Sequence, residues 1–341
     1  MSEKHRKLKI LIRTSGGSAK KKELGFGHIF RSINLSKMIS DNEIFFLIED
    51  HGGVKSVLQK NKIRNSIFLP KNLNLNKDIM ITKKILNEKK IDILIVDKYN
   101  INIKFFKGIS NEVKIVYISD LKKIQFPVDL VINGFIGFKN KVSRNKYNAK
   151  CLIGPKYQII NEKFVLNKLE KRPINLLVTF GGFDENGLIE LVIKRWLNMK
   201  EKFKMKIILG PGTKESKFIQ NNKKKYSKLL IIQKETTKMY SEMSKTKFGL
   251  CSGGITSYEF AIMNIPFGII CMTDHQRLTA NEWQKKNVAK NLGVYNLRLA
   301  KKVDNFLKLI LTDKLSLKKS RQIINQHGIK TIQKEIIKLV N

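Results

Sequence analysis

Two of the five histidines stand where an apolar run gives way to a helical pattern, beside residues suited to binding phosphate. The first, His28, lies in the segment GFGHIFR at residues 25–31, after the apolar run 8–13. Glycine lets backbone amides approach a ligand closely, and a helix N-terminus carries a partial positive charge. Gly25, Gly27 and His28 therefore predict a site for a phosphate-bearing ligand. Glycines at such a turn are also common for steric reasons alone, and that alternative stays open.

A second glycine turn lies at residues 251–259, in the segment CSGGITSYE. Hydroxyls and amides at a helix N-terminus can bind a diphosphate, and small residues allow the tight turn that this requires. The candidate ligands are Ser252, Gly253, Gly254, Thr256 and Ser257. Glu259 follows within reach of a group next to the diphosphate, and its carboxylate would fit both hydroxyls of a ribose. Alternatively, Glu259 is a glutamate of the first turns that the helix dipole stabilises.

The second of these histidines follows another predicted strand. His275 and Gln276 come directly after the apolar run 267–272, and Asn281 lies five residues beyond Gln276. A lone histidine is more often structural than catalytic, but His275 and His28 both fall at strand or helix ends that we expect to face a ligand.

Polar residues also close two strands of the first half, in the segments DKY at 97–99 and SD at 119–120. Aspartate and serine at such ends commonly form turns and cap helices, which gives them a purely local explanation. Tyr99 is the residue that capping explains least.

The elements that must position these residues are short β-branched runs alternating with longer amphipathic ones. We expect strands at 8–13, 44–48, 66–69, 91–97, 113–120 and 128–133, and again at 175–180, 205–209, 229–233, 248–251 and 267–272. Near-continuous apolar strands flanked by helices are typical of parallel sheets covered on both faces. In such α/β sheets the ligand lies at the carboxyl ends of the strands, where the residues described above stand.

The chain of 341 residues is long enough for two domains. Strand periodicity is lost near residues 154–173 and then restarts, so we predict an N-terminal lobe at 1–160, a linker at 161–173 and a C-terminal lobe at 174–341. Each lobe opens with a strand and a glycine turn, which predicts two Rossmann-like halves with the ligand in the cleft between them. The final segment, 316–340, has helical spacing that would allow it to pack back across the junction.

Composition excludes several classes of protein. The net charge of +39 comes from lysines spread along the whole chain, and no basic segment is interleaved with stacking aromatics, so we expect no nucleic-acid partner. Weak attraction to an anionic membrane surface is compatible with this charge. Cys151, Cys251 and Cys271 lack paired spacing, which predicts reduced, buried thiols and no metal site. With neither a signal-peptide pattern nor an apolar run of ~20 residues, we expect a cytoplasmic protein.

Six segments occur in the order seen in one family. They are GFGHIFR at 25–31, DKY at 97–99, YISD at 117–120, GPKY at 154–157, GGFD at 181–184 and SYEFA at 257–261. In this set the chain resembles the UDP-2,4-diacetamido-2,4,6-trideoxy-β-L-altropyranose hydrolases of pseudaminic acid biosynthesis. That family is similar in turn to the transferases that form lipid II from a UDP-linked N-acetylglucosamine, and it shares their two-lobed GT-B fold. The resemblance covers residues 10 to about 293.

The resemblance implies a role for each matched residue. His28 would be the general base that deprotonates a water attacking the anomeric carbon, and Tyr99 would orient that water. The turn at 253–257 would hold the diphosphate, and Glu259 the ribose. The other matched positions expected to contact the UDP-linked amino sugar are Arg31, Tyr157, Gly181 and Gly182. A helix N-terminus stabilises the charge of departing UDP, so we expect neither a cofactor nor a metal. We also expect the protein to be a monomer or a weak oligomer.

The chain departs from the family pattern at two places. The loop at 15–24 is longer than the family's usual approach to its Gly-x-Gly-His motif, and its glycines and position would allow a lid. His275-Gln276 replaces the usual Asn-Gln pair and looks more like the transferases, which the basic surface also favours. The second hypothesis is therefore a GT-B glycosyltransferase that passes a UDP-linked amino sugar to a lipid or glycan acceptor. A third is a binding protein without catalytic activity.

Overall fold

The computed structural model describes residues 6–17, 25–98, 101–110, 112–138, 142–166, 171–184, 186–315, 317, 324 and 326–340. The chain divides into two compact units. Of the described residues, the first unit holds those up to 17, those from 28 to 161 and those from 326 onward, and the second unit holds 25–27 and those from 162 to 324.

The first unit is built on a seven-stranded parallel sheet with the order β3-β2-β1-β4-β5-β6-β7. Its strands are β1 (Lys9–Gly16), β2 (Glu43–Asp50), β3 (Ser66–Leu69), β4 (Ile93–Asp97), β5 (Lys114–Ile118), β6 (Leu130–Asn133) and β7 (Lys150–Ile153). Its helices are α1 (Gly27–Met38), α2 (Val54–Lys60), α3 (Leu75–Lys89), α4 (Ile103–Ile109) and the 3-10 turn η1 (Pro155–Tyr157). The order reverses between β1 and β4, as in doubly wound folds.

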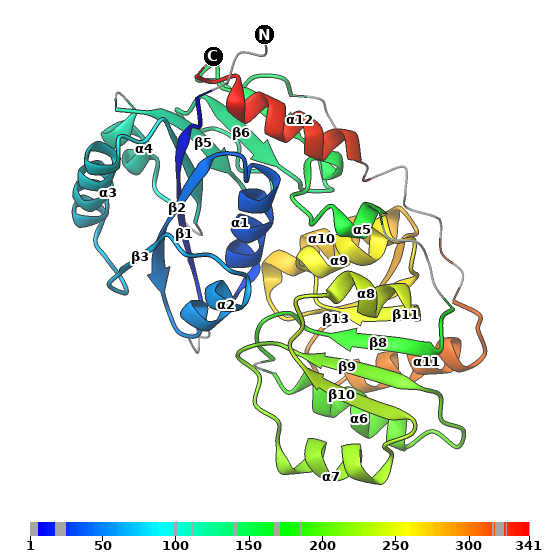
Figure 1. The fold of residues 1–341 in the computed structure, drawn as a ribbon. Helices are drawn as coiled ribbons and strands as arrows, with labels where there is room; N and C mark the ends of the chain where they lie inside the picture. The colour runs from blue at the N-terminus through cyan, green and yellow to red at the C-terminus, as the bar shows by residue number, and fades with distance from the viewer. Residues whose placement is uncertain are drawn as a thin grey trace. The chain divides into compact units, whose positions relative to one another are not determined.

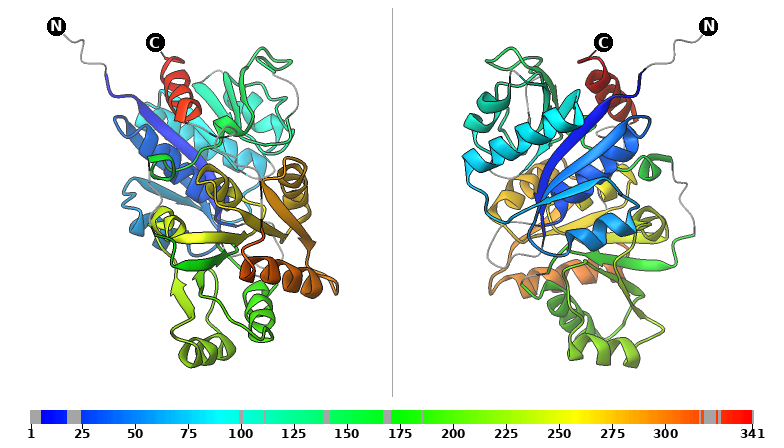
Figure 2. Two further views of the ribbon diagram at one scale, coloured as in Figure 1. Left: turned by 90° about the vertical axis from the view of Figure 1, so that its right-hand side faces the viewer. Right: turned by 60° about the vertical axis from the view of Figure 1, so that its left-hand side comes forward.

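Apolar side chains explain how these layers form. Residues 93–97 of β4 are all buried, which requires cover on both faces of the sheet. The helices α3 and α4 pack on one face through Ile85, Phe105 and Phe106, while α1 lies on the other face (Figures 1 and 2).

The second unit repeats this plan with a six-stranded parallel sheet in the order β10-β9-β8-β11-β12-β13. Its strands are β8 (Ile174–Thr179), β9 (Met205–Leu209), β10 (Leu230–Lys234), β11 (Thr246–Cys251), β12 (Phe267–Cys271) and β13 (Ala289–Val294). Its helices are α5 (Lys163–Leu166), α6 (Leu188–Leu197), α7 (Lys217–Lys225), α8 (Met239–Ser244), α9 (Ile255–Ile262), α10 (Asp274–Lys285) and α11 (Leu299–Leu311). The core packs α6 and α11 on one face through Trp196 and Phe306, and α9 and α10 cover the other (Figure 1).

The C-terminal helix α12 (Gln326–Ile337) belongs to the first unit, although the boundaries expected from the sequence assigned residues 174–341 to one lobe. It packs on η1, where a Cβ added to Gly328 would lie 1.6 Å from the carbonyl oxygen of Lys156. So close an approach is possible because residue 328 is glycine and has no side chain.

Two further sequence expectations can be compared with the described residues. Cys151, Cys251 and Cys271 are buried and free, which confirms the prediction of buried, unpaired thiols. Among the helices that the described ranges contain, none combines the length and the apolar character needed to cross a bilayer.

Candidate active site

In the first unit, the candidate residues meet where the sheet order reverses. Strand β1 pairs with β4, and the N-terminus of α1 and the final residue of β4, Asp97, lie at the carboxyl ends of these two strands. This is the place where doubly wound sheets bind ligands.

His28 and Asp97 form a hydrogen-bonded dyad there. His28 Nδ1 lies 2.6 Å from Asp97 Oδ1, and the Asp97 side chain is fully buried while that of His28 is 15% exposed. A carboxylate so close requires the proton on Nδ1, so that Nε2 acts as the acceptor of the ring. Asp97 therefore orients His28 and sets the tautomer that a general base needs.

Arg31 holds two carboxylates together beside this histidine. Its Nε lies 2.9 Å from Asp97 Oδ2, and its Nη1 lies 2.6 Å from Asp120 Oδ1. Burial alone would raise the pKa of Asp97, but Arg31 and His28 lower that pKa to about 2. Burial likewise opposes ionisation of Asp120, and Arg31 and His28 still lower its pKa below the usual value. Both carboxylates are therefore anionic at neutral pH.

Asp120 also faces the outer nitrogen of the dyad. Its Oδ2 lies 3.9 Å from His28 Nε2, beyond hydrogen-bond distance, and its side chain is 45% exposed. The arrangement places an imidazole and a carboxylate side by side at an accessible edge of the sheet.

The two glycines before His28 are not crowded by the residues that the structure describes. A Cβ added to Gly25 or to Gly27 would meet no described atom within 4 Å, and neither residue has the positive φ that favours glycine. The described contacts give no support to the steric explanation left open by the sequence, and close approach of a ligand to these glycines stays a prediction.

In the second unit, two glycine turns converge on Ser252. A Cβ added to Gly181, after β8, or to Gly254, after β11, would lie 3.9 Å from Ser252 Oγ. Gly181 has φ +79°, which favours glycine, and Gly182 accepts a hydrogen bond on its carbonyl oxygen from the amide of Gly212. Strands β8 and β11 are neighbours at the reversal of strand order, as β1 and β4 are in the first unit. The turn of Gly181, after β8, therefore occupies the topological position that His28 has after β1.

Gln276 and Ser257 fix the shape of the turn between β11 and α9. Gln276 Oε1 accepts hydrogen bonds from the amides of Met272, at 2.8 Å, and Gly253, at 3.3 Å. Ser257 Oγ donates to the carbonyl oxygen of Gly254 and accepts from Trp283 Nε1, so both functions of this buried hydroxyl are used within the protein. A Cβ on Gly253 would lie 2.8 Å from the Gln276 backbone oxygen, which leaves no room for a side chain. These residues build the turn, and its helix N-terminus presents the remaining amides of α9.

Glu259 lies one turn further along α9 and is partly buried. Burial raises its pKa from 4.5 to about 7. A carboxyl group with such a pKa changes charge near neutral pH. A ligand that donates hydrogen bonds to it stabilises its ionised form.

The raised pKa predicts a pH-dependent cost in stability. The pKa of Glu259 is higher in the folded state than in the unfolded state. The stability that the protonated Glu259 carboxyl group contributes is therefore fully present below pH 4.5 and is lost as the pH rises through about 7. We expect Glu259→Gln to be more stable than the wild type by about 2 kcal/mol near pH ~8, with a smaller difference near pH ~5. Urea unfolding of the ligand-free proteins measures this, with Glu282→Gln as a control, because Glu282 is paired with Lys285 on the surface of α10. Equal stabilities at both pH values would contradict a buried Glu259 carboxyl group.

The structure places the other predicted site residues as follows. Thr256 is buried in the first turn of α9, and His275 is partly buried at the start of α10. Asn281 is exposed, and its Oδ1 accepts a hydrogen bond from Asn291 at 2.8 Å. Tyr157 lies in η1 of the first unit, with Lys156 Nζ 4.8 Å from its ring centre. Tyr99 lies outside the described residues, as does most of the loop at 15–24.

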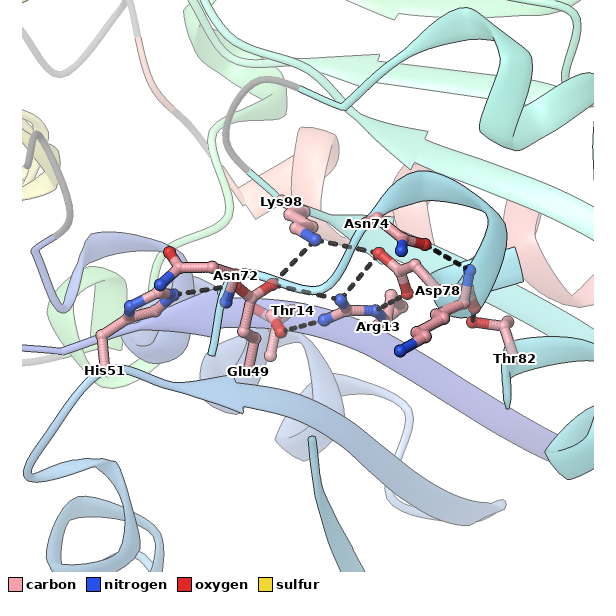
Figure 3. A network of polar contacts seen from close by, with 10 residues as sticks. Arg13, Thr14, Glu49, His51, Asn72, Asn74, Asp78, Thr82 and Lys98 are labelled. Carbon is pink, nitrogen blue, oxygen red and sulfur yellow. Dashed lines mark hydrogen bonds and ion pairs between the residues drawn. The ribbon is translucent and has the colours of Figure 1, made fainter. Parts of the chain in front are cut away.

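A buried charged network that the sequence did not suggest lies on the first unit, around Arg13 (Figure 3). Arg13 is fully buried on β1 and binds Asp78 of α3 through two nitrogens, at 3.0 and 2.9 Å. Lys98 Nζ lies 2.9 Å from Asp78 and 2.8 Å from Glu49, and His51 Nε2 lies 3.0 Å from Glu49. The signal that could have revealed it is an arginine directly after the apolar residues 10–12 of a central strand.

Sequence comparison finds distant relatives. No protein-family model matches the chain. The chain is 29% identical over 297 residues to an uncharacterized protein, MJ1062, of Methanocaldococcus jannaschii, in a match that covers 82% of this chain and only 59% of that protein. It is 25% identical to the spore coat polysaccharide biosynthesis protein SpsG of Bacillus subtilis, over 81% of this chain and 82% of that protein. It is 24% identical to a UDP-2,4-diacetamido-2,4,6-trideoxy-β-L-altropyranose hydrolase of Campylobacter jejuni, over 82% of this chain and 97% of the hydrolase.

Similar solved structures share the whole fold at low sequence identity. Acinetobacter baumannii MurG has a TM-score of 0.64 at 13% identity, covering 97% of this chain and 99% of MurG. Staphylococcus aureus MnaA, solved with UDP, has a TM-score of 0.63 at 13% identity, covering 98% and 97%. The UDP-GlcNAc 2-epimerase of Neisseria meningitidis, bound to UDP-GlcNAc, has a TM-score of 0.57 at 11% identity, covering 97% and 100%. The chain thus has the GT-B-like fold of two parallel α/β lobes that its sequence predicts, and its sequence is distantly similar to those of polysaccharide-biosynthesis and UDP-sugar hydrolase proteins.

Proposed function

We propose that this protein is a UDP-sugar hydrolase that cleaves the anomeric C–O bond of a UDP-linked diacetamido-trideoxy sugar. The observation that carries the proposal is the His28–Asp97 dyad at the carboxyl edge of the first sheet, oriented as a general base. The sequence similarity to the Campylobacter jejuni hydrolase supports the choice of substrate class.

The UDP moiety is assigned to the second unit. The N-terminus of α9 supplies backbone amides and a positive partial charge for the diphosphate, and Ser252 stands between the two glycine turns beside it. Glu259 accepts hydrogen bonds from the ribose hydroxyls. Since the pKa of Glu259 is about 7 without ligand, binding of a ribose favours its ionised form and releases a proton near neutral pH.

The chemical step is assigned to the first unit. His28 Nε2 takes a proton from water, the water oxygen bonds to the anomeric carbon, and the electron pair of the breaking C–O bond leaves on the β-phosphate oxygen of UDP. Asp97 stabilises the imidazolium that forms, because its carboxylate already accepts the Nδ1 proton.

The test is UDP release from a small panel of UDP-linked diacetamido sugars, without acceptor, with a chelator present and in ¹⁸O-labelled water. We expect rapid release with the label in the free sugar, as cleavage at the anomeric carbon requires. Label in UDP would mean attack at phosphorus and would contradict the mechanism. Release that needs a divalent metal would contradict the assignment of charge stabilisation to the α9 N-terminus.

A GT-B glycosyltransferase remains the second candidate, favoured by His275-Gln276 at the start of α10 and by the net charge of +39, which suits an anionic membrane. For a transferase, the UDP-sugar would be bound, but its UDP would be released only after a lipid or glycan acceptor is added to take the sugar. Efficient release into water alone decides in favour of the hydrolase.

The proposed product gives the protein a place in surface-glycan synthesis. A free diacetamido sugar is a precursor for nonulosonic acids of the pseudaminic type, and the similarity to a spore coat polysaccharide biosynthesis protein agrees with such a pathway.

A further inference from the structure

Asp120 lies beside the proposed base but has no role in the chemical step described above. Its Oδ2 lies 3.9 Å from His28 Nε2 and accepts a hydrogen bond from Arg31 Nη2 at 3.2 Å, and Arg31 Nη1 donates to its other oxygen at 2.6 Å. The same guanidinium holds Asp97, so the orientation of the histidine and of Asp120 depends on one side chain. Asp120 is thus fixed relative to the base although nearly half of its side chain is exposed.

We propose that His28 Nε2 and Asp120 Oδ2 together bind the attacking water through both of its protons, and that Asp120 thereby selects water over an alcohol. This inference rests on the proposed hydrolase function and deepens it, because it names the residue that distinguishes hydrolysis from transfer.

The distance between the two acceptors suits a single water molecule. Two hydrogen bonds of about 2.8 Å to acceptors 3.9 Å apart meet at the water oxygen at about 90°. That angle is somewhat smaller than the angle between the two O–H bonds of water, and within the bend that hydrogen bonds tolerate. With both protons directed at protein acceptors, the lone pairs of the oxygen point away from them, toward an incoming electrophilic carbon.

The protonation states agree with this arrangement. In the neutral ring of His28, Nδ1 donates to Asp97, which makes Nε2 an acceptor, and Asp120 is ionised because Arg31 lowers its pKa against the effect of burial. During the reaction one water proton passes to Nε2 and the other stays hydrogen-bonded to Asp120. The oxygen forms the new bond to the anomeric carbon while UDP departs with the electron pair of the old one.

An alcohol fits the same position poorly. It has one hydroxyl proton, which His28 must remove, so its alkyl group would face the Asp120 carboxylate. Loss of hydration at an anionic oxygen without a replacement hydrogen bond is costly. The pair therefore favours water, as a hydrolase requires.

The experiment measures the partition of the sugar between water and methanol. The probe is UDP-2,4-diacetamido-2,4,6-trideoxy-β-L-altropyranose, or the panel member that the wild type turns over, in buffer containing methanol. Total UDP release gives the rate, and mass spectrometry gives the ratio of methyl glycoside to free sugar. For Asp120→Ala we expect hydrolysis to fall about 10- to 100-fold, since one hydrogen bond to a charged group is lost, and the methyl glycoside ratio to rise.

Two further variants separate catalysis from structure. Asp120→Asn keeps the size of the side chain and an amide oxygen, so we expect the same changes with smaller amplitude. Glu112→Gln removes a carboxylate from a surface ion pair with Lys83 in the same unit, 3.1 Å in length, and is expected to change neither rate nor ratio. A methyl glycoside ratio unchanged in both Asp120 variants overturns the inference even if the wild type hydrolyses the substrate. Absence of hydrolysis by the wild type would instead refute the proposed function itself.

Discussion

Replacing His28 by alanine is expected to lower kcat for UDP release by about 10³-fold, because general base catalysis contributes a factor of this order. The loss should appear in kcat and not in KM, since the nucleotide is assigned to the second unit and His28 lies in the first. Steady-state kinetics with the best substrate of the panel, together with calorimetric titration of UDP, separates the two quantities. We expect the affinity for UDP to remain close to that of the wild type.

His327→Ala is the matched control for this change. His327 is an exposed histidine on α12, also in the first unit, and its loss removes the same side chain from a position outside the candidate site. We expect wild-type kcat for this variant. Equal UDP release by His28→Ala and His327→Ala would show that His28 is not the base.

Asp97→Asn tests the orientation of the base without removing it. The amide cannot provide the charge that stabilises the imidazolium, and it weakens the bonds to Arg31 as well. We therefore expect kcat to fall by at least about 10²-fold with His28 still present. A thermal unfolding curve of the variant separates this loss from a loss of fold.

The helix starts and central strands around the candidate site could be predicted from the sequence because their local signals are strong. Glycine turns after apolar runs mark Gly27 and Gly254 as helix starts, and the reversal of strand order brings such starts to the centre of each sheet. The hydrophobic pattern of β1 and β4 is nearly continuous because both strands are central and covered on both faces.

The pairing of side chains could not be predicted from the same signals. Arg31 meets Asp97 and Asp120 across 66 and 89 residues, and the sequence gives each aspartate an equally good explanation as a capping residue.

Edge strands are also harder to predict. Strand β13 lies at the edge of its sheet and contains Lys290, Asn291 and Gly293, so it lacks the apolar run of a central strand.

The second large effect is expected in stability, at the buried network of Figure 3. Asp78→Ala should lower the free energy of unfolding by about 3–5 kcal/mol, because it leaves the fully buried Arg13 without the carboxylate that binds two of its nitrogens. Urea unfolding at neutral pH measures this. Asp304→Ala removes a carboxylate from a partly exposed ion pair with Arg195, and should cost less than about 1 kcal/mol.

The loss of stability in Asp78→Ala comes more from leaving the Arg13 charge buried and unpaired than from the net stabilisation that the Arg13–Asp78 ion pair provides. Replacing both partners by apolar residues of similar volume, as in Arg13→Met with Asp78→Leu, should therefore recover much of the loss. Glu49 sets a limit to the recovery, because Lys98, the amide of Asn72 and Arg13 lower its pKa to about 2 against the effect of burial. Its contribution is present above pH 4.5 and is lost as the pH falls toward 2. A double variant that stays as unstable as Asp78→Ala would mean that Arg13 stabilises the sheet through Glu49 and the carbonyl oxygen of Thr14 instead of Asp78.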